Sequence, residues 1–359
     1  MSIRLRCLVV GIIWGSCMQV WSQERSPEQV AKELAGVYGH RLAQVAYIPS
    51  VPLIAKLRLP FAKDEGYVSQ VEETVQPFRR QSLPLPKSGS EQAGYLVFVE
   101  MAERTTGKER EEWIALVMHG ASGFFDEEGR SRGLMPHHNE MSDSIFMACP
   151  LLAAAGKLSG ETRYLDATVE HFQGMAKHCW REDGIYRHSP LCEAAWGRGN
   201  GFPAMGLAWA LSIMPEDTSN HEVLRQAYRK HMQALRRWQD IKTGCWHQVI
   251  DHAESYEEYT CTCMIGWAMA RGIRRGWISA DEFQPHVVMA WKAMESRTST
   301  SGEFRNVCPS TGKLKTLQEY LDRTPTQGKD DRGGAMGLLF VSELLQNSEL
   351  LQALSSLPK

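Results

Sequence analysis

Apolar residues in the second half of the chain follow two alternating patterns. In the first pattern almost every position is apolar, over Ser144–Ala155, Ala204–Met214 and Thr260–Ile273. In the second, the apolar residues form one stripe at helical spacing, over Thr162–Cys179, His221–Trp238 and Asp281–Met294. The first pattern predicts helices that are buried on all sides, and the second predicts helices with one face in solvent.

The apolar segments recur at a regular interval. They begin near residues 143, 203 and 260, so about sixty residues separate successive starts, a spacing typical of stacked helical hairpins. Ala93–Ala102 and Ala335–Leu345 are similar segments on either side. We therefore expect an all-α ring of hairpins, with the apolar helices inside and the striped helices outside. In such a ring the inner helices run in the same direction, so their N-termini gather on one face.

Polar and ionisable residues precede each predicted inner helix. They are Glu91–Gln92, Glu140–Asp143, Arg198–Gly201, Glu257–Tyr259 and Asp330–Asp331. The ring would bring them to one end, together with the loops that carry His188 and His247. This convergence predicts a functional site, although acids and amides before a helix also serve ordinary N-capping. Taken alone, Asp143 is more simply explained as a cap or a first-turn acid.

The segment from Trp196 to Phe202, Trp-Gly-Arg-Gly-Asn-Gly-Phe, is the strongest candidate for a binding loop. Its glycines permit positive φ and close backbone approach, while the Arg198 guanidinium can bind a carboxylate with two parallel hydrogen bonds. Trp196 can stack on a sugar ring, and Pro203 fits the first turn of the apolar helix that follows. We therefore expect a glycine-rich loop for a small anionic ligand, placed on the N-terminus of a buried helix.

The first residues of the chain change the expected location of the protein. A short basic start, an apolar run and the small residues before Gln23 predict a secretory signal peptide over residues 1–22, cut after Ser22. The run is too short for a membrane span, and Trp14 fits poorly into a lipid-attachment pattern before Cys17. We expect residues 23–359 to form one exported domain, in the periplasm or outside the cell, with a lipoprotein less favoured.

Net charge, cysteine spacing and histidine spacing argue against nucleic-acid binding, disulfides and a zinc site, respectively. The formal net charge is −2 and no basic stripe is present, which argues against nucleic-acid binding. Of the nine cysteines, Cys7 and Cys17 fall in the signal peptide, and the remaining seven lack Cys-x-x-Cys spacing, so we expect few or no disulfides. His137-His138 lacks the helical spacing with a nearby acid that is typical of zinc sites, as does the pair His247 and His252. We expect no metal and no other cofactor.

Several short motifs in this chain resemble those of a known family. From about Asn139 to Leu345 the chain is similar to glycoside hydrolase family 105, the unsaturated rhamnogalacturonyl hydrolases, with the unsaturated glucuronyl hydrolases of family 88 as relatives. The resemblance rests on Ser142-Asp143-Ser-Ile-Phe-Met-Ala-Cys-Pro, Gly184-Ile-Tyr-Arg-His188, Trp196-Gly-Arg-Gly-Asn-Gly201, Trp246-His-Gln-Val-Ile-Asp251, Gly272-Ile-Arg-Arg-Gly-Trp277 and Asn306-Val-Cys308. These motifs occur in family order with family-like gaps.

The resemblance implies an (α/α)6 barrel and a particular reaction. Members of the family remove a 4,5-unsaturated uronic acid from the non-reducing end of oligosaccharides that polysaccharide lyases release. An aspartic acid protonates the vinyl-ether double bond, water adds at C5, and the hemiketal that results opens to release the rest of the chain. Asp143 matches this acid and base. Trp196 and Arg198 match the substrate loop, and His188 matches a histidine of the pocket.

The resemblance also marks where this chain departs from the family. The family has a second aspartate at the start of the preceding inner helix, where this chain reads Ser88-Gly-Ser-Glu-Gln-Ala-Gly94, so Glu91 is the candidate replacement. Phe202 stands where the family usually has tryptophan. The segment Tyr47–Pro86 is broken by several prolines and matches the family poorly, so we expect a divergent N-terminal third that rebuilds the substrate subsites.

We therefore predict a hydrolase of unsaturated uronyl oligosaccharides, with Asp143 as catalytic acid and base. The predicted substrate ligands are His188, Trp196, Arg198, Asn200, Phe202, His247 and Glu91. Two alternatives remain open: another enzyme on the same toroid, such as a polysaccharide lyase or a sugar epimerase, and a non-catalytic carbohydrate-binding relative with an altered pocket. The expected partner is an oligosaccharide with an unsaturated uronate end. The source polysaccharide, the next sugar and the oligomeric state stay undetermined.

Overall fold

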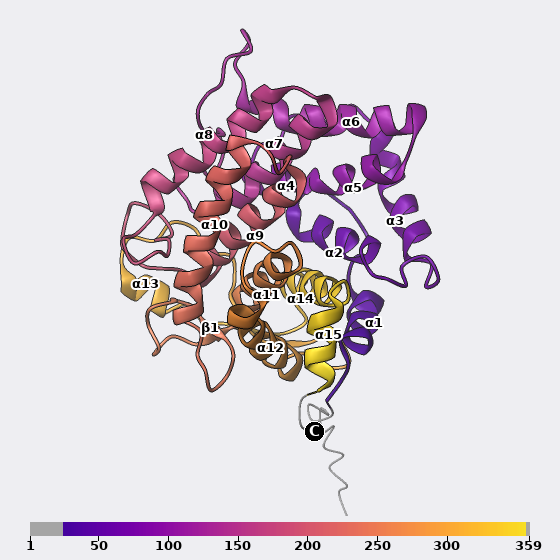
Figure 1. Ribbon diagram of the computed structural model, residues 1–359. Helices are drawn as coiled ribbons and strands as arrows, with labels where there is room; N and C mark the ends of the chain where they lie inside the picture. Colours follow the sequence, from indigo (N-terminus) through magenta and orange to yellow (C-terminus); the bar gives the residue numbers. More distant parts are fainter. Residues whose placement is uncertain (1–23, 357–359) are drawn as a thin grey trace, which may run out of the picture.

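The computed structural model describes residues 24–356, so the predicted signal peptide lies outside the described residues. Six helical units form an inner ring in which each touches the next, and the last touches the first. They are α2 (Tyr47–Leu57), α4 with α5 (Gly89–Gly94 and Leu96–Arg104), α7 (Ser144–Ser159), α9 (Gly197–Ile213), α11 (Tyr259–Arg274) and α14 (Asp331–Leu344). Figure 1 shows these helices around a common centre. The predicted inner helices are confirmed.

A second layer of helices surrounds the ring (Figure 1). It consists of α1 (Pro27–Val37), α3 (Tyr67–Val75), α6 (Gly107–Ala121), α8 (Thr162–Cys179), α10 (Ser219–Arg237) and α12 (Ala280–Ser296). The short α15 (Ser348–Ser355) packs on α12 and α14, while the 3₁₀ turns η1 (Gln76–Arg80) and η2 (Ser122–Phe124) follow α3 and α6. The prediction of an (α/α)6 toroid is confirmed, and the N-terminal third, despite its prolines, supplies complete inner and outer helices.

The inner helices begin on the same face of the ring. Tyr47 is the first residue of α2, and its ring centroid lies 6.0 Å from that of Phe146 in the first turn of α7 and 5.6 Å from that of Phe202 near the start of α9. The rings of Phe146 and Phe202 stack at 5.7 Å. This aromatic contact holds three helix starts together, as expected for inner helices that run in one direction.

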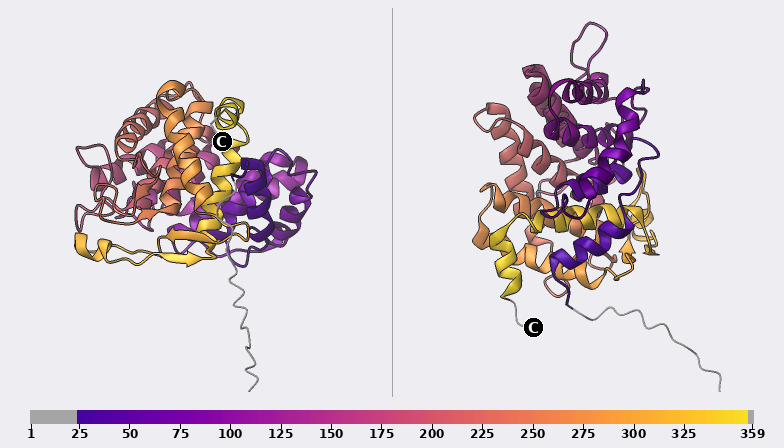
Figure 2. Two further views of the ribbon diagram at one scale, coloured as in Figure 1. Left: turned by 90° about the horizontal axis from the view of Figure 1, so that it is seen from below. Right: turned by 90° about the vertical axis from the view of Figure 1, so that its right-hand side faces the viewer.

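One long connection crosses this face of the ring. Residues 297–330, which we call the strap, lead from the end of α12 to the start of α14 and contain β3 (Phe304–Val307), α13 (Leu317–Leu321) and β4 (Thr326–Gly328). β3 pairs with β4 in antiparallel fashion. The left view of Figure 2 shows the strap as a gold segment along the lower edge of the ring. A second short hairpin, β1 (Trp246–His247) with β2 (Glu257–Glu258), precedes α11.

The predicted glycine-rich loop is the one local feature that the structure corrects. Gly197 to Phe202 form the first turns of α9, and Gly197 and Gly199 do not have positive φ. A Cβ on Gly197 would lie 2.7 Å from the His247 carbonyl oxygen, and one on Gly199 would lie 3.0 Å from Ser142 Oγ. These glycines therefore allow close approach of neighbouring segments, and helix formation wins because the buried contacts outweigh the low helix propensity of glycine.

The described residues also bear on the cysteines and on membrane association. All seven cysteines from Cys149 to Cys308 are free thiols, and six of them are buried. Within residues 24–356, no helix combines the length and the apolar character that a bilayer crossing would need.

Candidate active site

Asp143 immediately precedes α7 but does not act as a side-chain cap. Its backbone is already helical, with φ −51° and ψ −32°, and its carboxylate accepts no capping hydrogen bond from the described chain. The residue is 7% exposed. An uncapped carboxylate held at the start of a buried helix disfavours the simple capping interpretation, because such a cap would bond to the backbone of the first turn.

Ser142 and Pro203 join the starts of α7 and α9. Pro203 has no N–H, so it leaves the carbonyl of Gly199, four residues earlier, without its helical donor. The Ser142 hydroxyl donates to that carbonyl at 2.6 Å, and the Ser142 N–H donates to the His188 carbonyl at 2.9 Å. The Gly199 carbonyl, which Pro203 leaves without a helical donor, thus accepts from Ser142. Through its two hydrogen bonds Ser142 connects the segments that carry Asp143, His188 and Arg198.

His188 faces Asp143 from the segment that precedes α9. Its Nε2 atom lies 3.4 Å from Asp143 Oδ1, and its Nδ1 atom lies 2.7 Å from the Tyr320 hydroxyl of the strap. The His188 side chain is fully buried. Neither Nε2 of His188 nor Oδ1 of Asp143 has a hydrogen-bond partner within the described residues. The two atoms face each other across a gap that is slightly longer than a hydrogen bond.

Arg198 reaches from the first turn of α9 to the strap. Its Nη1 donates to the Cys308 carbonyl at 2.5 Å and its Nη2 donates to the Pro309 carbonyl at 2.9 Å, while Nε is buried without a partner among residues 24–356. The guanidinium lies over the Trp196 ring, 4.9 Å from its centroid. Burial acts to lower the pKa of Arg198, but nearby acidic groups that include Glu258 and Asp143 raise it, so the guanidinium stays charged.

Trp196, Asn200 and Phe202 surround this group from within the protein. The Trp196 ring lies 4.5 Å from the His188 ring and is 1% exposed, so in the free protein it supports His188 and Arg198. The Asn200 amide exchanges hydrogen bonds with the Tyr186 backbone in both directions, at 2.8 Å each. Phe202 packs on Tyr47 and Phe146. Direct contact of these three side chains with a ligand stays a prediction.

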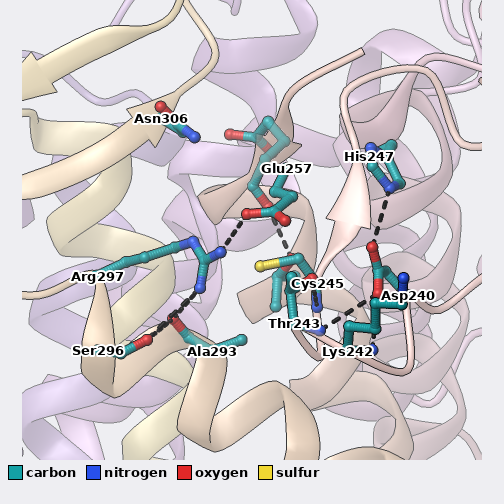
Figure 3. Close-up of polar contacts among 12 residues, drawn as sticks. Asp240, Lys242, Thr243, Cys245, His247, Glu257, Ala293, Ser296, Arg297 and Asn306 are labelled. Atoms are coloured by element: carbon teal, nitrogen blue, oxygen red, sulfur yellow. Dashed lines mark hydrogen bonds and ion pairs between the residues drawn. The ribbon is translucent and has the colours of Figure 1, made fainter. Parts of the chain in front are cut away.

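Glu91 and His247 form their hydrogen bonds and ion pairs with residues other than Asp143 and His188. The Glu91 carboxylate accepts from the Lys87 N–H at 2.8 Å, at the start of α4. His247 lies in β1, where Nδ1 is 2.7 Å from the Ser255 carbonyl and Nε2 is 3.6 Å from Asp240 Oδ2. Figure 3 shows the His247 ring directed toward Asp240. Their predicted roles as substrate ligands stay predictions.

The same hairpin carries an ion pair that anchors the neighbouring elements. Glu257 in β2 pairs with Arg297 at the end of α12, and Arg297 also donates to the Ala293 carbonyl at 3.2 Å (Figure 3). The next residue, Glu258, is fully buried and caps α11. Its Oε1 also accepts from the Cys308 N–H at 2.9 Å, so it attaches the strap to the ring beside Arg198.

His138, Gln92 and Tyr320 belong to the site although the sequence pattern did not select them. His138 has φ 56°, which is unusual for a residue other than glycine, and its Nδ1 is buried without a partner in the described chain. Burial lowers the pKa of His138, against the opposing charge of Asp143. The Gln92 side chain is buried with both amide atoms unpartnered among residues 24–356. A strained backbone and unpaired buried amides are signals that only coordinates reveal.

Gly89 accounts for the position of His138. A Cβ at Gly89 would come within 2.1 Å of His138 Nδ1, so the imidazole packs directly on the backbone of α4. Gln92 lies three residues later, on the same face of that short helix. Unsatisfied polar groups from α4, α7 and α9 therefore gather where the inner helices begin. Buried polar groups usually have partners, so this cluster indicates a place for a polar ligand.

An open groove of about 610 Å³ lies along the strap and the start of α14. It is lined by Tyr38, Ile48, Ser310, Lys329, Asp330 and Arg332. Ser310 directly follows Pro309, which binds Arg198, and Ile48 follows Tyr47, which contacts Phe202. The lining of the groove thus includes chain neighbours of the residues that bind Arg198 and pack on Phe202.

Comparisons with known proteins place the fold and the family. The model of Glycosyl Hydrolase Family 88 matches residues 60–348. The unsaturated rhamnogalacturonyl hydrolase YesR of Bacillus subtilis is 22% identical over 221 residues, which cover 58% of this chain and 61% of that protein. An unsaturated 3S-rhamnoglycuronyl hydrolase of Formosa agariphila is 23% identical over 170 residues, which cover 42% of this chain and 45% of that protein. The matches thus span less than two thirds of either relative.

A solved structure agrees with the arrangement of the helices. The structure of a family 105 glycoside hydrolase of C. acetobutylicum ATCC 824 superposes with a TM-score of 0.76 at 17% identity. The superposition covers 89% of this chain and all of the other. At this identity the likeness shows the fold, and the site must be argued from the residues of this chain.

Proposed function

Because the chain belongs to glycosyl hydrolase family 88, as the match over residues 60–348 shows, we propose that it is an unsaturated uronyl hydrolase. It removes a 4,5-unsaturated uronic acid from the non-reducing end of oligosaccharides released by polysaccharide lyases. The observation that carries this proposal is the buried pair of Asp143 and His188 near Arg198, in which Asp143 Oδ1 and His188 Nε2 lie 3.4 Å apart and have no other partner in the described chain. This arrangement offers a proton donor next to a site for an anion.

Asp143 acts first as an acid and then as a base. Its carboxyl proton adds to C4 of the vinyl-ether double bond, and positive charge develops at C5 and the ring oxygen. The carboxylate then accepts a proton from water as the water oxygen bonds to C5, which restores the acid. The bond between C5 and the ring oxygen then breaks, which leaves a ketone at C5 and a hemiacetal at C1. The hemiacetal collapses to an aldehyde and releases the remaining saccharide as an alcohol. No second carboxylate across the scissile bond is needed, in contrast to ordinary glycoside hydrolysis.

The other residues bind and orient the uronate. Arg198 supplies positive charge for the substrate carboxylate, and its guanidinium packs on the Trp196 ring. His188 fixes the position of Asp143. His138 and Gln92 offer further unpartnered polar atoms. The open groove lined by Ser310, Lys329 and Arg332 provides room for the saccharide that leaves.

The experiment that tests this function follows the ultraviolet absorbance of the conjugated double bond. Wild-type protein should cause a loss of absorbance with at least one lyase-generated oligosaccharide. Asp143→Asn keeps the shape of the side chain but has no proton to donate, so kcat should fall by at least about 10²-fold. Substrate binding, measured by calorimetry, should change little. Asp217→Asn, on an exposed loop, is the matched control and should retain full activity.

Two outcomes would contradict the proposal. A rise in absorbance on intact polysaccharide, which survives the Asp143→Asn change, would indicate a lyase, because a lyase creates the double bond that the hydrolase consumes. Binding of unsaturated oligosaccharides without any change in absorbance would indicate a carbohydrate-binding protein.

A further inference from the structure

The strap contributes one side chain to the pair of Asp143 and His188. Tyr320 lies in α13, is fully buried, and places its hydroxyl oxygen 2.7 Å from His188 Nδ1. Its ring also packs edge-on against the His188 ring, with centroids 5.7 Å apart. Tyr320 lies outside the motifs that contain Asp143, His188 and Arg198.

The hydrogen bonds around Tyr320 determine the direction of its proton. The Leu314 N–H donates to the Tyr320 oxygen at 3.2 Å, so that side of the hydroxyl is an acceptor. The hydroxyl has one proton, and within residues 24–356 the remaining partner at hydrogen-bond distance is His188 Nδ1. Burial raises the pKa of Tyr320, so the proton stays on the oxygen. Tyr320 therefore donates to Nδ1, and Nδ1 carries a lone pair.

A neutral histidine with a lone pair on Nδ1 has its proton on Nε2. In this structure Nε2 is the atom that faces Asp143 Oδ1, at 3.4 Å. The proton thus points at the carboxylate and becomes a hydrogen-bond donor to it whenever Asp143 is charged. In the opposite tautomer a lone pair would face the carboxylate, which repels it.

We propose that Tyr320 is a positioning residue that holds His188 in the Nε2–H tautomer, so that His188 stabilises the Asp143 carboxylate formed when the substrate double bond is protonated. The tautomer itself follows from the contacts, whereas its effect on turnover rests on the function proposed above. The strap is therefore part of the active site through α13, in addition to its carbonyl contacts with Arg198.

The Tyr320→Phe variant removes the donor and keeps the buried ring. Without it, the neutral imidazole loses a hydrogen bond, so the Nδ1–H tautomer and the imidazolium become more favourable. Besides Tyr320, the titratable groups around the pair are Tyr47, His138, Cys179 and Arg198. All of these stay in place in the variant. Tyr186→Phe is the matched control, because its hydroxyl is also buried but has no partner in the described part of the chain.

Nitrogen NMR of protein labelled at histidine measures the tautomer directly, with the His188 signal assigned through His188→Gln. We expect the Nε2–H form in the wild type and in Tyr186→Phe, and Nδ1–H or a mixture in Tyr320→Phe. We also expect kcat of Tyr320→Phe to fall about tenfold or more while KM changes little. The alkaline limb of its pH profile should move to higher pH, because in the Nδ1–H tautomer a lone pair faces Asp143 and disfavours the carboxylate relative to the acid form.

The outcomes separate this proposal from a merely structural role of Tyr320. An Nδ1–H tautomer in the wild type would overturn the proposal, and that outcome does not depend on whether Tyr320→Phe folds. An unchanged tautomer and an unshifted pH profile in Tyr320→Phe, even with lower kcat, would also overturn it. Lack of turnover by the wild type on every unsaturated oligosaccharide would count against the proposed function alone, since the tautomer can still be read.

Discussion

At the scale of single residues, Arg198 shows how backbone carbonyls hold a buried guanidinium. Two of its nitrogens donate to the consecutive carbonyls of Cys308 and Pro309, and its plane lies over Trp196. Carbonyl oxygens stabilise the guanidinium without neutralising it. The Arg198 guanidinium therefore has two functions. It binds the strap to α9, and it places a positive charge close to Asp143.

This geometry predicts that Arg198→Lys releases the strap. An ammonium group cannot reach both carbonyls in the planar geometry of a guanidinium, so at least one charge-assisted hydrogen bond is lost, at a cost of about 2 kcal/mol in the free energy of unfolding. Trypsin should then cut faster at Lys313 and Lys315 of the strap, as followed by mass spectrometry. Arg229→Lys in α10, whose Nε donates to the Trp277 carbonyl, is the control. Equal cleavage of the strap in both variants would contradict this account.

At the scale of elements, α8 supports the start of α7 through a buried histidine. His171 Nδ1 accepts from the Met135 N–H at 3.2 Å, and Nε2 lies 3.0 Å from both the hydroxyl and the carbonyl oxygen of Ser144. Ser144 directly follows Asp143 in the chain. A neutral imidazole, with one acceptor and one donor nitrogen, therefore fixes the helix end that carries the candidate acid.

His171 makes the fold sensitive to acid. Burial lowers the pKa of His171 to about 4 from a usual value of 6.5, so between these values the unfolded chain binds a proton that the folded chain does not. The stability due to this difference is present above pH 6.5 and is lost as pH falls toward 4, by about 3 kcal/mol at 1.36 kcal/mol per pH unit. Urea unfolding at a series of pH values measures this loss.

A pair of substitutions on the same helix isolates the effect. His171→Gln cannot titrate, so its stability should fall less steeply between pH 6.5 and 4 than that of the wild type. Part of the slope remains, because burial also lowers the pKa of His231 to about 4. His178→Gln, on the exposed side of α8, should keep the wild-type slope. Identical slopes for the two variants would show that His171 is not the responsible group.

At the scale of the whole molecule, the ring is closed by contacts between the two ends of the chain. α14 packs against α2, and α1 packs on α14 from outside. Arg25, just before α1, donates to Glu33 and Glu295 at 2.7 and 2.9 Å and to the backbone carbonyls of Glu295 and Thr298. Its side chain is 6% exposed. One arginine thus joins the start of the described chain to the end of α12, where the strap begins.

Loss of this connection should destabilise the whole domain. Arg25→Ala leaves two partly buried carboxylates and two carbonyls without their donor, so we expect the free energy of unfolding to fall by about 3 kcal/mol. Lys157→Ala removes an exposed ion pair with Glu103 and should cost at most about 1 kcal/mol. Equilibrium urea unfolding compares the two. A similar small loss in both would mean that the ring closes without help from Arg25.

The sequence by itself determined the class of the fold and the end of the ring that carries the site. The two apolar patterns separated inner from outer helices, because burial on all sides and burial on one face leave different periodicities. The family motifs identified Asp143, His188, Trp196 and Arg198 as a group, and the structure brings these four side chains together. Local periodicity and motif order were sufficient here because these features are encoded in neighbouring residues.

Tertiary structure alone decided which partners those residues meet. The segment predicted as a glycine-rich loop forms the first turns of α9, and its glycines serve close packing, because a Cβ at Gly197 or Gly199 would crowd the His247 carbonyl or Ser142. Tyr320 reaches His188 across 132 positions of sequence, and Arg198 reaches Cys308 across 110. The strained backbone of His138 and the unpaired Gln92 amide likewise depend on neighbours from other helices. Contacts between residues so far apart in the sequence depend on the closed ring and on the path of the strap. No local sequence pattern specifies them.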